Sequence, residues 1–395
     1  MIGRRCIAAA TAAVLVMTAG CSQIQSGTVV SGPPTPKLDT GNFPTTPRQI
    51  GPTSSYDAWG QEGWRMADGV AAPWSVDPAL THNTPKASGG VMVGEYNTEL
   101  SPALTPEQAN ALSGNPPLGG FVAVAGDAPT PTRTLSIGML RFADANAAKR
   151  ALELITVNAP ALPDGFPPID GAAALNTDGG GLPAGLSVAT VRGDLLLIAQ
   201  ATGQSPTQVT ELAGKALAAQ VDKAHDYHPT PYDGVPPLKV PMDPDGFVSR
   251  TLPPASDNVP GVTPDEGYRT PYAAGLADPS QAAGDVSDAT KYGVDLVAIM
   301  SVAGGLLYRT HDDAAAQQIF TDRTKLRPNV AWYPIPGLPN DVATCTTVHE
   351  LTSGDEGKGF CRLHYGRYYA AFMTSTPALT KKAAAAEYLI LKNAG

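Results

Sequence analysis

Two distant stretches of the sequence share one pattern and decide the fold: GMLRFADANAA, residues 138–148, and GLLYRTHDDAA, residues 305–315. Each begins with a short apolar run that is typical of a strand and continues into an alanine-rich run that is typical of a helix. Acidic residues stand at the beginning of each expected helix, where the helix dipole favours them. Aligned residue by residue, with Gly138 opposite Gly305, the two stretches predict one strand–helix unit that occurs twice.

The repeat continues downstream of both stretches. A strand at 192–198 precedes a helix at 207–221, and a strand at 365–371 precedes a helix at 378–391. Ser205-Pro206 and Thr376-Pro377 stand just before these helices. A Ser or Thr cap followed by Pro is a typical helix start, so both helices are expected to begin at these dipeptides.

Upstream of each stretch the sequence predicts a helix and then a strand: 105–111 and 120–125 in the first half, 279–292 and 294–302 in the second. Adjacent strands that are joined by turns favour antiparallel pairing. We therefore expect an α+β fold of two repeat-related halves, each an antiparallel sheet covered by helices. The alternative is that similar composition alone produces the match.

The N-terminus has the pattern of an export signal. Arg4 and Arg5 precede the apolar run 7–17, which is too short to span a bilayer. The small residues Thr18-Ala19-Gly20 stand before Cys21, and this tetrapeptide resembles a bacterial lipobox, although Leu is commoner than Thr at its first position. The alternative is a plain secretory signal with a chance cysteine.

The resemblance to a lipobox implies cleavage between Gly20 and Cys21, with diacylglycerol on the cysteine thiol and a fatty acid such as palmitate on its new amine. Two or three acyl chains hold a protein firmly at a membrane, whereas one does not. We therefore expect the mature protein on the outer face of the bacterial plasma membrane, with the membrane as its partner through the anchor.

Composition divides the rest of the chain. Residues 1–20 are the signal, and residues 21–55 are polar and Pro-rich, which predicts a disordered tether. The first half then covers 56–224, a Pro- and Gly-rich connection outside the core covers 225–278, and the second half covers 279–395.

The charge balance is acidic. The formal net charge of −9 becomes −11 when Arg4 and Arg5 leave with the signal, and 43% of the residues are hydrophobic against 16% charged. The hydrophobic and charged fractions are typical of a globular protein, and the negative net charge argues against nucleic acid as a partner.

Only two cysteines remain after the signal and the expected lipid site, Cys345 and Cys361. In an oxidising compartment such a pair is read most simply as a disulfide. The surrounding sequence predicts strands at 343–351 and 360–373 with a polar turn between them, which would place the two cysteines opposite each other.

Several short motifs resemble an actinobacterial, mycobacterial-type envelope lipoprotein family of unknown function. They are the segments 65–68 (RMAD), 268–274 (YRTPYAA), 307–310 (LYRT) and 365–368 (YGRY), together with the cysteine hairpin. The resemblance covers most of the mature chain and implies an address and an architecture. It implies no activity.

The sequence lacks the main catalytic and cofactor motifs. There is no G-x-S-x-G nucleophile elbow, no phosphate-binding G-x-x-x-x-G-K-[ST] loop and no G-x-G-x-x-G, and the glycine run 179–181 is expected to be linker. His225 and His228 have a spacing that suits a metal, but the prolines that follow favour an exposed linker. Asp243–Gly246 resembles the start of a calcium loop without its later Glu, so a plain turn is favoured. No cofactor or metal is expected.

Three further histidines have ordinary explanations. His311 with Asp312 and Asp313 could be a base held by carboxylates, but helix capping is favoured. His349 and His364 flank the cysteine hairpin and are interpreted as surface-strand residues, since no nucleophile or third ligand stands near them.

Aromatic residues gather in the second half. Read as one strand, the sequence places Tyr365, Arg367 and Tyr369 on one face, and this face is either a recognition surface or a second core layer. The expected function is non-enzymatic: a lipid-anchored envelope protein that binds a ligand or a protein partner, in a groove between the halves. The alternatives are a structural or accessory lipoprotein without a small-molecule site and, less favoured, an enzyme with an unfamiliar site.

Overall fold

The computed structural model describes residues 37–51, 53–85, 89–94, 104–175, 184–253, 267–300, 305–325, 331–348 and 357–395. Lys37–Gly395 form one compact unit. The expected cleavage site at Gly20 and Cys21, the glycine run 179–181 and His349 lie outside the described residues.

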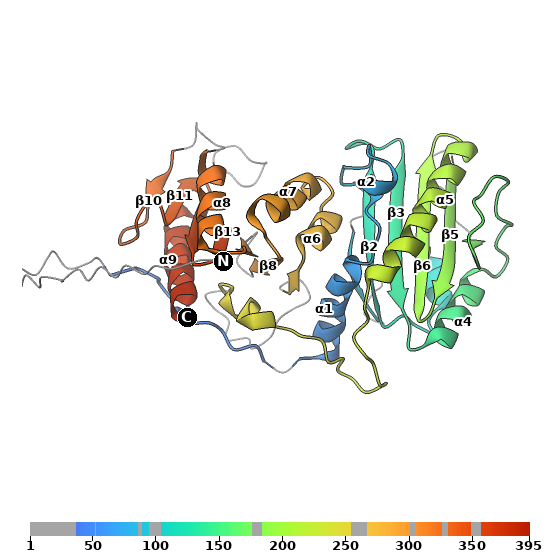
Figure 1. Ribbon diagram of the computed structural model, residues 1–395, viewed down its shortest axis with the longest axis horizontal. Coiled ribbons are helices and arrows are strands. Elements are labelled where there is room, and N and C mark those ends of the chain that lie inside the picture. Colours follow the sequence, from blue (N-terminus) through green and yellow to red (C-terminus); the bar gives the residue numbers. More distant parts are fainter. Residues whose placement is uncertain are drawn as a thin grey trace, which may run out of the picture. The chain divides into compact units, whose positions relative to one another are not determined.

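Both halves of the chain contain helices and strands (Figure 1). The first half contains α1 (Ser55–Ala67), α2 (Pro73–Val76), β1 (Gly90–Val93), α3 (Pro106–Ala111), β2 (Gly119–Gly126), β3 (Thr134–Arg141), α4 (Ala145–Ile155), β4 (Ala173–Leu175), β5 (Ala184–Arg192), β6 (Leu195–Gly203) and α5 (Pro206–Lys223). The second contains β7 (Tyr268–Arg269), α6 (Pro271–Ala277), α7 (Ala282–Tyr292), β8 (Leu296–Met300), β9 (Gly305–Arg309), α8 (Asp313–Lys325), β10 (Tyr333–Pro334), β11 (Ala343–Thr347), β12 (Gly359–Tyr365), β13 (Tyr368–Thr374) and α9 (Pro377–Asn393).

The two sheets have the same strand order. The described strands of the first half are ordered β1-β2-β3-β6-β5-β4, and those of the second are ordered β7-β8-β9-β13-β12-β11, with β10 added at the edge. Every pair of neighbours is antiparallel. The expected α+β fold of two repeat-related antiparallel halves is confirmed.

The strand pairing aligns the two halves one residue away from the alignment that the sequence predicts. Arg141 pairs with Leu195, the first residue of β6, and Arg309 pairs with Tyr368, the first residue of β13. The next amide donates to the hairpin turn in both halves, Phe142 N to Asp194 O and Thr310 N to Arg367 O. Arg141 is therefore equivalent to Arg309. The sequence comparison had placed Tyr308 at this position, because it matched glycines instead of strand register.

Helix starts are alike in the two halves. Ser205 and Thr376 cap α5 and α9 by accepting the amide three residues later, and Pro stands at the first helical position of both. Asp144 accepts the Ala147 amide at the start of α4, as Asp312 accepts the Ala315 amide at the start of α8. These caps satisfy amides that would otherwise lack a partner, and they confirm the predicted starts of α5 and α9.

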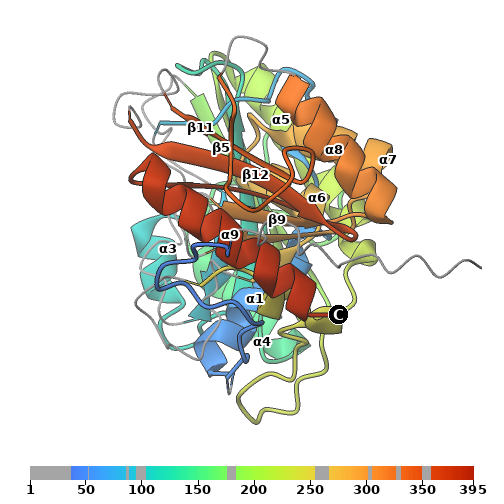
Figure 2. The same ribbon diagram turned by 90° about the vertical axis from the view of Figure 1, so that its left-hand side faces the viewer.

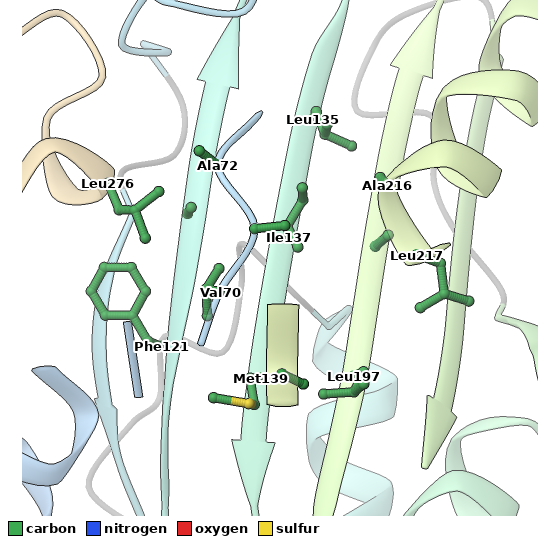
Figure 3. Packing of buried hydrophobic residues seen from close by; sticks show 14 of the residues in the cluster. Val70, Ala72, Phe121, Leu135, Ile137, Met139, Leu197, Ala216, Leu217 and Leu276 are labelled. Atoms are coloured by element: carbon green, nitrogen blue, oxygen red, sulfur yellow. The ribbon is translucent and has the colours of Figure 1, made fainter. Parts of the chain in front are cut away.

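Both faces of the first sheet are covered. On one face, residues of β2, β3 and β6 pack with α1 and α5; Figure 3 shows Phe121, Ile137, Met139 and Leu197 of these strands with Ala216 and Leu217 of α5. On the other face, α4 packs its residues Ala147, Ala148, Ala151 and Ile155 against the opposite side chains of the same strands. Continuous burial along β2 follows from this double cover.

The second sheet is covered in the same way. α9 lies along β12 on one face, as Figure 2 shows, and contributes Ala383, Ala384, Ala386, Ile390 and Leu391 to that core. α7 and α8 cover the other face, where Ile319 and Phe320 pack with Tyr308 and Tyr369. Thus α5 corresponds to α9 and α4 corresponds to α8.

Residues 37–50 pack on the second half, whereas the sequence placed them in a disordered tether that ends at 55. Phe43 is 7% exposed and belongs to the core beneath α9. Asn393 donates to Thr45 O, and the Arg48 amide donates to Ser249 O. Figure 2 shows this segment, in dark blue, beside α9. A single Phe in a Pro-rich stretch has no periodicity, so pattern reasoning missed it.

The connection 225–278 also contributes to both cores, contrary to the prediction that it lies outside them. Phe247 and Leu252 are fully buried with the second half. Ala273 and Leu276 of α6 are fully buried with the first half, and Figure 3 shows Leu276 above Phe121. The connection was misread because its apolar residues are spaced irregularly between prolines.

Candidate functional site

An open surface cavity of about 460 Å³ lies where the ends of α1 and α5 meet the start of α6 and the C-terminal half of α7. Its walls combine polar and apolar side chains: Asp68, Lys223, Asp226, Thr270, Pro271, Tyr272, Val286, Ala289 and Thr290. Its size suits a small molecule, and its mixture of apolar walls and a few polar groups is typical of small-molecule sites.

A hydrogen bond between Asp68 and Thr270 connects α1 to α6 at the cavity. Asp68 caps the C-terminus of α1, and Thr270 caps the N-terminus of α6 by accepting the Ala273 amide. The Thr270 hydroxyl donates its proton to Asp68 Oδ1 at 2.5 Å. Burial raises the pKa of the Asp68 carboxyl, and the hydroxyl, Lys223 and Arg65 offset part of that rise. Asp68 is thus a half-buried acid in the lining of the cavity.

Tyr272 presents its ring to the cavity in a fixed orientation. Its hydroxyl donates to Val70 O at 2.7 Å, and burial raises its pKa above the ordinary value. Lys223, in the last turn of α5, places Nζ 4.8 Å from the centre of this ring. The same Nζ lies 2.8 Å from Asp226 Oδ2 and lowers the pKa of that carboxyl. The ammonium of Lys223 is therefore held by an aromatic face and a carboxylate.

α1 holds the start of the second half in place beside the cavity. The side-chain amide of Gln61 donates to Tyr268 O and accepts the Tyr268 amide, so it pairs with both backbone groups of the short strand β7. The Arg269 guanidinium lies 3.6 Å from the ring centre of Trp64. These contacts cover the edge of the second sheet and fix α6 relative to α1.

A second cavity, of about 470 Å³, lies at the start of α9. Three lysines and an acid surround it, Lys37, Lys381, Lys382 and Asp39. Lys382 pairs with Asp39 at 3.4 Å, and Lys381 lies 4.3 Å from the ring centre of Tyr333. Two of its three cations are thus engaged.

The expected recognition surface of Tyr365, Arg367 and Tyr369 does not form. A two-residue turn at Gly366–Arg367 separates β12 from β13, so the three residues do not share one strand. Tyr369 is 1% exposed in the core beneath α7 and α8, and Tyr365 packs edge-on against Tyr388 of α9. Arg367 alone is exposed, and it donates to Thr310 O.

His311 and His364 both have structural partners. Asp312 caps α8, as the favoured interpretation had it, while His311 Nδ1 lies 2.9 Å from Tyr292 O. His364 is buried beside Phe320, with Nε2 2.8 Å from Asp341 O, and so is no surface residue as predicted. Burial follows from α8, which covers this part of β12.

Of the two motifs considered as metal sites, the histidine pair begins in a short 3-10 helix, Ala224–Asp226, after α5, and the Asp243 motif forms a turn. His225 and His228 are exposed, and Asp243 accepts the Val248 and Ser249 amides of a tight turn. Within the described ranges, no group of three or more His, Cys, Asp or Glu side chains could hold a metal ion. The same part of the chain has no helix long and apolar enough to cross a membrane.

The disulfide is formed as predicted. Cys345 of β11 and Cys361 of β12 are direct partners in the antiparallel register, and their Cα atoms lie 4.1 Å apart. Both side chains are fully buried in the core beneath α9.

Comparison with known families identifies both halves. Residues 51–240 match the domain of unknown function DUF7373, N-terminal part, and residues 247–394 match its C-terminal part. The chain belongs to the DUF7373 family. Its cavity draws Asp68, Lys223 and Asp226 from the N-terminal part and the α6 and α7 residues from the C-terminal part.

Comparisons with individual proteins add little to the family match. No curated protein matches the chain. Among solved structures, the extracellular domain of PknH from Mycobacterium tuberculosis is similar at 12% identity and a TM-score of 0.25, over 42% of this chain and 96% of that one. So low a score supports no argument about this DUF7373 protein.

The cavity residues of this DUF7373 protein could not be identified from sequence, although some of them lie in the short motifs described above. Asp68 ends the segment 65–68, and Thr270 and Tyr272 lie in the segment 268–274. Nothing in either segment indicates that the Asp of one bonds the Thr of the other. The signal was present only as two separate motifs, and their contact depends on tertiary structure.

Proposed function

We propose that the protein is a lipid-anchored lipoprotein of the bacterial cell envelope, of the actinobacterial type, whose body binds a small molecule in the cavity between α1, α5, α6 and α7. The cavity is the observation that carries the binding role, because it lies where the two parts of the family meet, is of ligand size, and joins apolar walls to a few fixed polar groups. The role is non-enzymatic, in keeping with the lack of catalytic motifs in the sequence.

The anchored location rests on the sequence of the N-terminus and on the cysteines. The tetrapeptide that ends at Cys21 resembles a lipobox, and the Cys345–Cys361 pair suits an oxidising compartment outside the cytoplasm. The signal before Cys21 is removed in this proposal, and the lipid on Cys21 holds the protein at the outer face of the plasma membrane.

Metabolic labelling with a clickable fatty acid tests the anchor. Cells that express the wild-type chain should label it, and a Cys21→Ser variant should carry no label and leave the membrane fraction or remain uncleaved. Cys6→Ser is the matched control and should label like the wild type. Label that persists in Cys21→Ser would exclude this anchor.

Ligand-observed NMR of the full-length protein in detergent tests the binding role. A library of small polar and charged solutes should yield ligands that bind the wild type and lose binding in Ala289→Trp, which fills the cavity from α7. Lys215→Trp, on the exposed side of α5, controls for a general effect of tryptophan. Ligands that bind Ala289→Trp as well as the wild type, or no ligand from the library, would overturn the role.

A further inference from the structure

The ammonium group of Lys223 indicates which kind of charge the cavity residues can bind. Its ammonium lies against the Tyr272 ring and 2.8 Å from the Asp226 carboxylate. An aromatic face beside a carboxylate is the arrangement with which proteins bind organic ammonium ions. The lysine therefore occupies a cation site that the surrounding residues build, and its side chain reaches that site from the last turn of α5.

A second acid in the same cavity has less compensation. Asp68 accepts the Thr270 hydroxyl, and in the described part of the chain it forms no ion pair within 4.0 Å. Burial raises its pKa, because the loss of water by the charged form outweighs the hydrogen bond from Thr270 and the attraction of Lys223 and Arg65. A cation that enters the cavity would supply the missing partner.

The charges and walls favour a particular kind of cation. Two acids and one lysine line the cavity, so an anion would meet two like charges, and the lysine is already paired. Val286, 45% exposed, and Ala289 form an apolar wall on α7. Together they suit a molecule with an ammonium head and a short aliphatic body.

We propose that the cavity binds a small organic ammonium ion, whose head displaces the Lys223 ammonium from the Tyr272 ring and pairs with Asp68 and Asp226. This inference rests on the proposed binding role and names its ligand class. Lys223 acts as an internal competitor: it closes the cation site when no ligand is present and swings toward solvent when one binds.

Binding of n-butylammonium, n-butanol and n-butanoate to the full-length protein in detergent at pH 7, measured by ligand-observed NMR, tests the inference. Butylammonium should bind, while the neutral and anionic analogues should bind at least about fivefold more weakly, as the loss of one cation–aromatic contact implies. Asp68→Asn and Tyr272→Leu should each weaken butylammonium by a similar factor.

The decisive variant is Lys223→Ala. Because it removes the competitor, it should bind butylammonium about fivefold more tightly than the wild type, whereas a merely structural lysine would give equal or weaker binding. Lys215→Ala, on the exposed side of the same helix, should change nothing. Equal binding of butanoate, or no gain in Lys223→Ala, would overturn the inference.

The outcomes also separate this inference from the proposed binding role. If other solutes bind the wild type and lose binding in Ala289→Trp while ammonium ions do not bind, the cavity is a binding site for another class of ligand. If neither ammonium ions nor other solutes bind, both the inference and the binding role fail.

Discussion

α5 and α9 occupy equivalent places in the two halves, and each has a buried polar side chain. The side chain in α5 is hydrogen-bonded, whereas the one in α9 is not. Counted from the caps Ser205 and Thr376, Gln220 of α5 stands where α9 has Leu391, and Glu387 of α9 stands where α5 has Ala216. Gln220 donates to Gly69 O and accepts the Ala71 amide. Both carboxyl oxygens of Glu387 are buried without a hydrogen-bond partner.

The difference shows that, at equivalent helices of one fold, a buried polar side chain can either stabilise the structure through hydrogen bonds or destabilise it by lacking them. Gln220 satisfies two backbone groups of the segment between α1 and α2, so it joins that segment to α5. Glu387 satisfies nothing, and burial raises its pKa well above the ordinary value, although the charge of Arg48 offsets part of the rise. The polarity of a side chain therefore does not reveal its contribution until its partners are known.

Gln220→Leu, which copies the residue of α9 into α5, should give the largest loss. It leaves the Gly69 carbonyl and the Ala71 amide buried without partners, at about 1–3 kcal/mol each, so we expect a loss of roughly 4 kcal/mol in urea unfolding of the full-length protein. Lys215→Leu, exposed on the same helix, should change stability by less than about 0.5 kcal/mol. A loss below 1 kcal/mol for Gln220→Leu would mean that α5 does not depend on this connection.

Removal of the disulfide should weaken only one of the two halves. Cys345→Ala combined with Cys361→Ala should cost about 3 kcal/mol, since the bridge closes a loop of about 15 residues. Amide exchange should quicken in β11 and β12 and stay nearly unchanged in β2 and β3, which belong to a half with no cysteine. Equal quickening in both sheets would show that the halves unfold as one.

Glu387→Leu should stabilise the protein, in contrast to Gln220→Leu. At a pH above about 4.5 the unfolded chain releases a proton that the native Glu387 keeps, so the stability of the wild type falls as pH rises toward the raised pKa, by about 1.4 kcal/mol per unit. The variant lacks this loss. We expect a gain in the free energy of unfolding at pH 7 that shrinks toward pH 4, measured by urea unfolding across this range, and a gain that does not depend on pH would exclude this account.

The two caps should give the smallest effects and the closest agreement. Ser205→Ala and Thr376→Ala each remove one hydrogen bond to the first turn of a long helix, at about 1 kcal/mol. Nearly equal losses in thermal unfolding would support the equivalence of α5 and α9. If one cap costs less than 0.3 kcal/mol and the other more than 1.5, the likeness of the two helices is geometric only.

Much of the fold could be predicted from sequence because its signals are local. The strand–helix order, the caps at Ser205 and Thr376 and the cysteine hairpin all depend on residues within one or two turns or strands of one another. The alignment of the two halves was predicted one residue out, since glycines at 138 and 305 look alike in sequence although they occupy different positions in their strands.

The candidate site could not be predicted because it depends on contacts between distant residues. Asp68 and Thr270 are ordinary helix-terminal residues until their elements meet. The tyrosines near 365–369 misled for a related reason: Gly366 adopts a positive φ of 51° and turns the chain, so alternation along one strand does not apply. Burial of Phe43 likewise depends on α9, at the other end of the chain.

The core of each half includes a residue from outside that half's own stretch of sequence. Phe43, which precedes the N-terminal part of the family, packs beneath α9, and Leu276, within the C-terminal part, packs on the first sheet. During synthesis, Phe43 leaves the ribosome long before α9 exists, roughly half a minute earlier at usual elongation rates. The first segment of the body to be made must therefore be the last to dock, and Phe43 stays exposed on the nascent chain until α9 has been made.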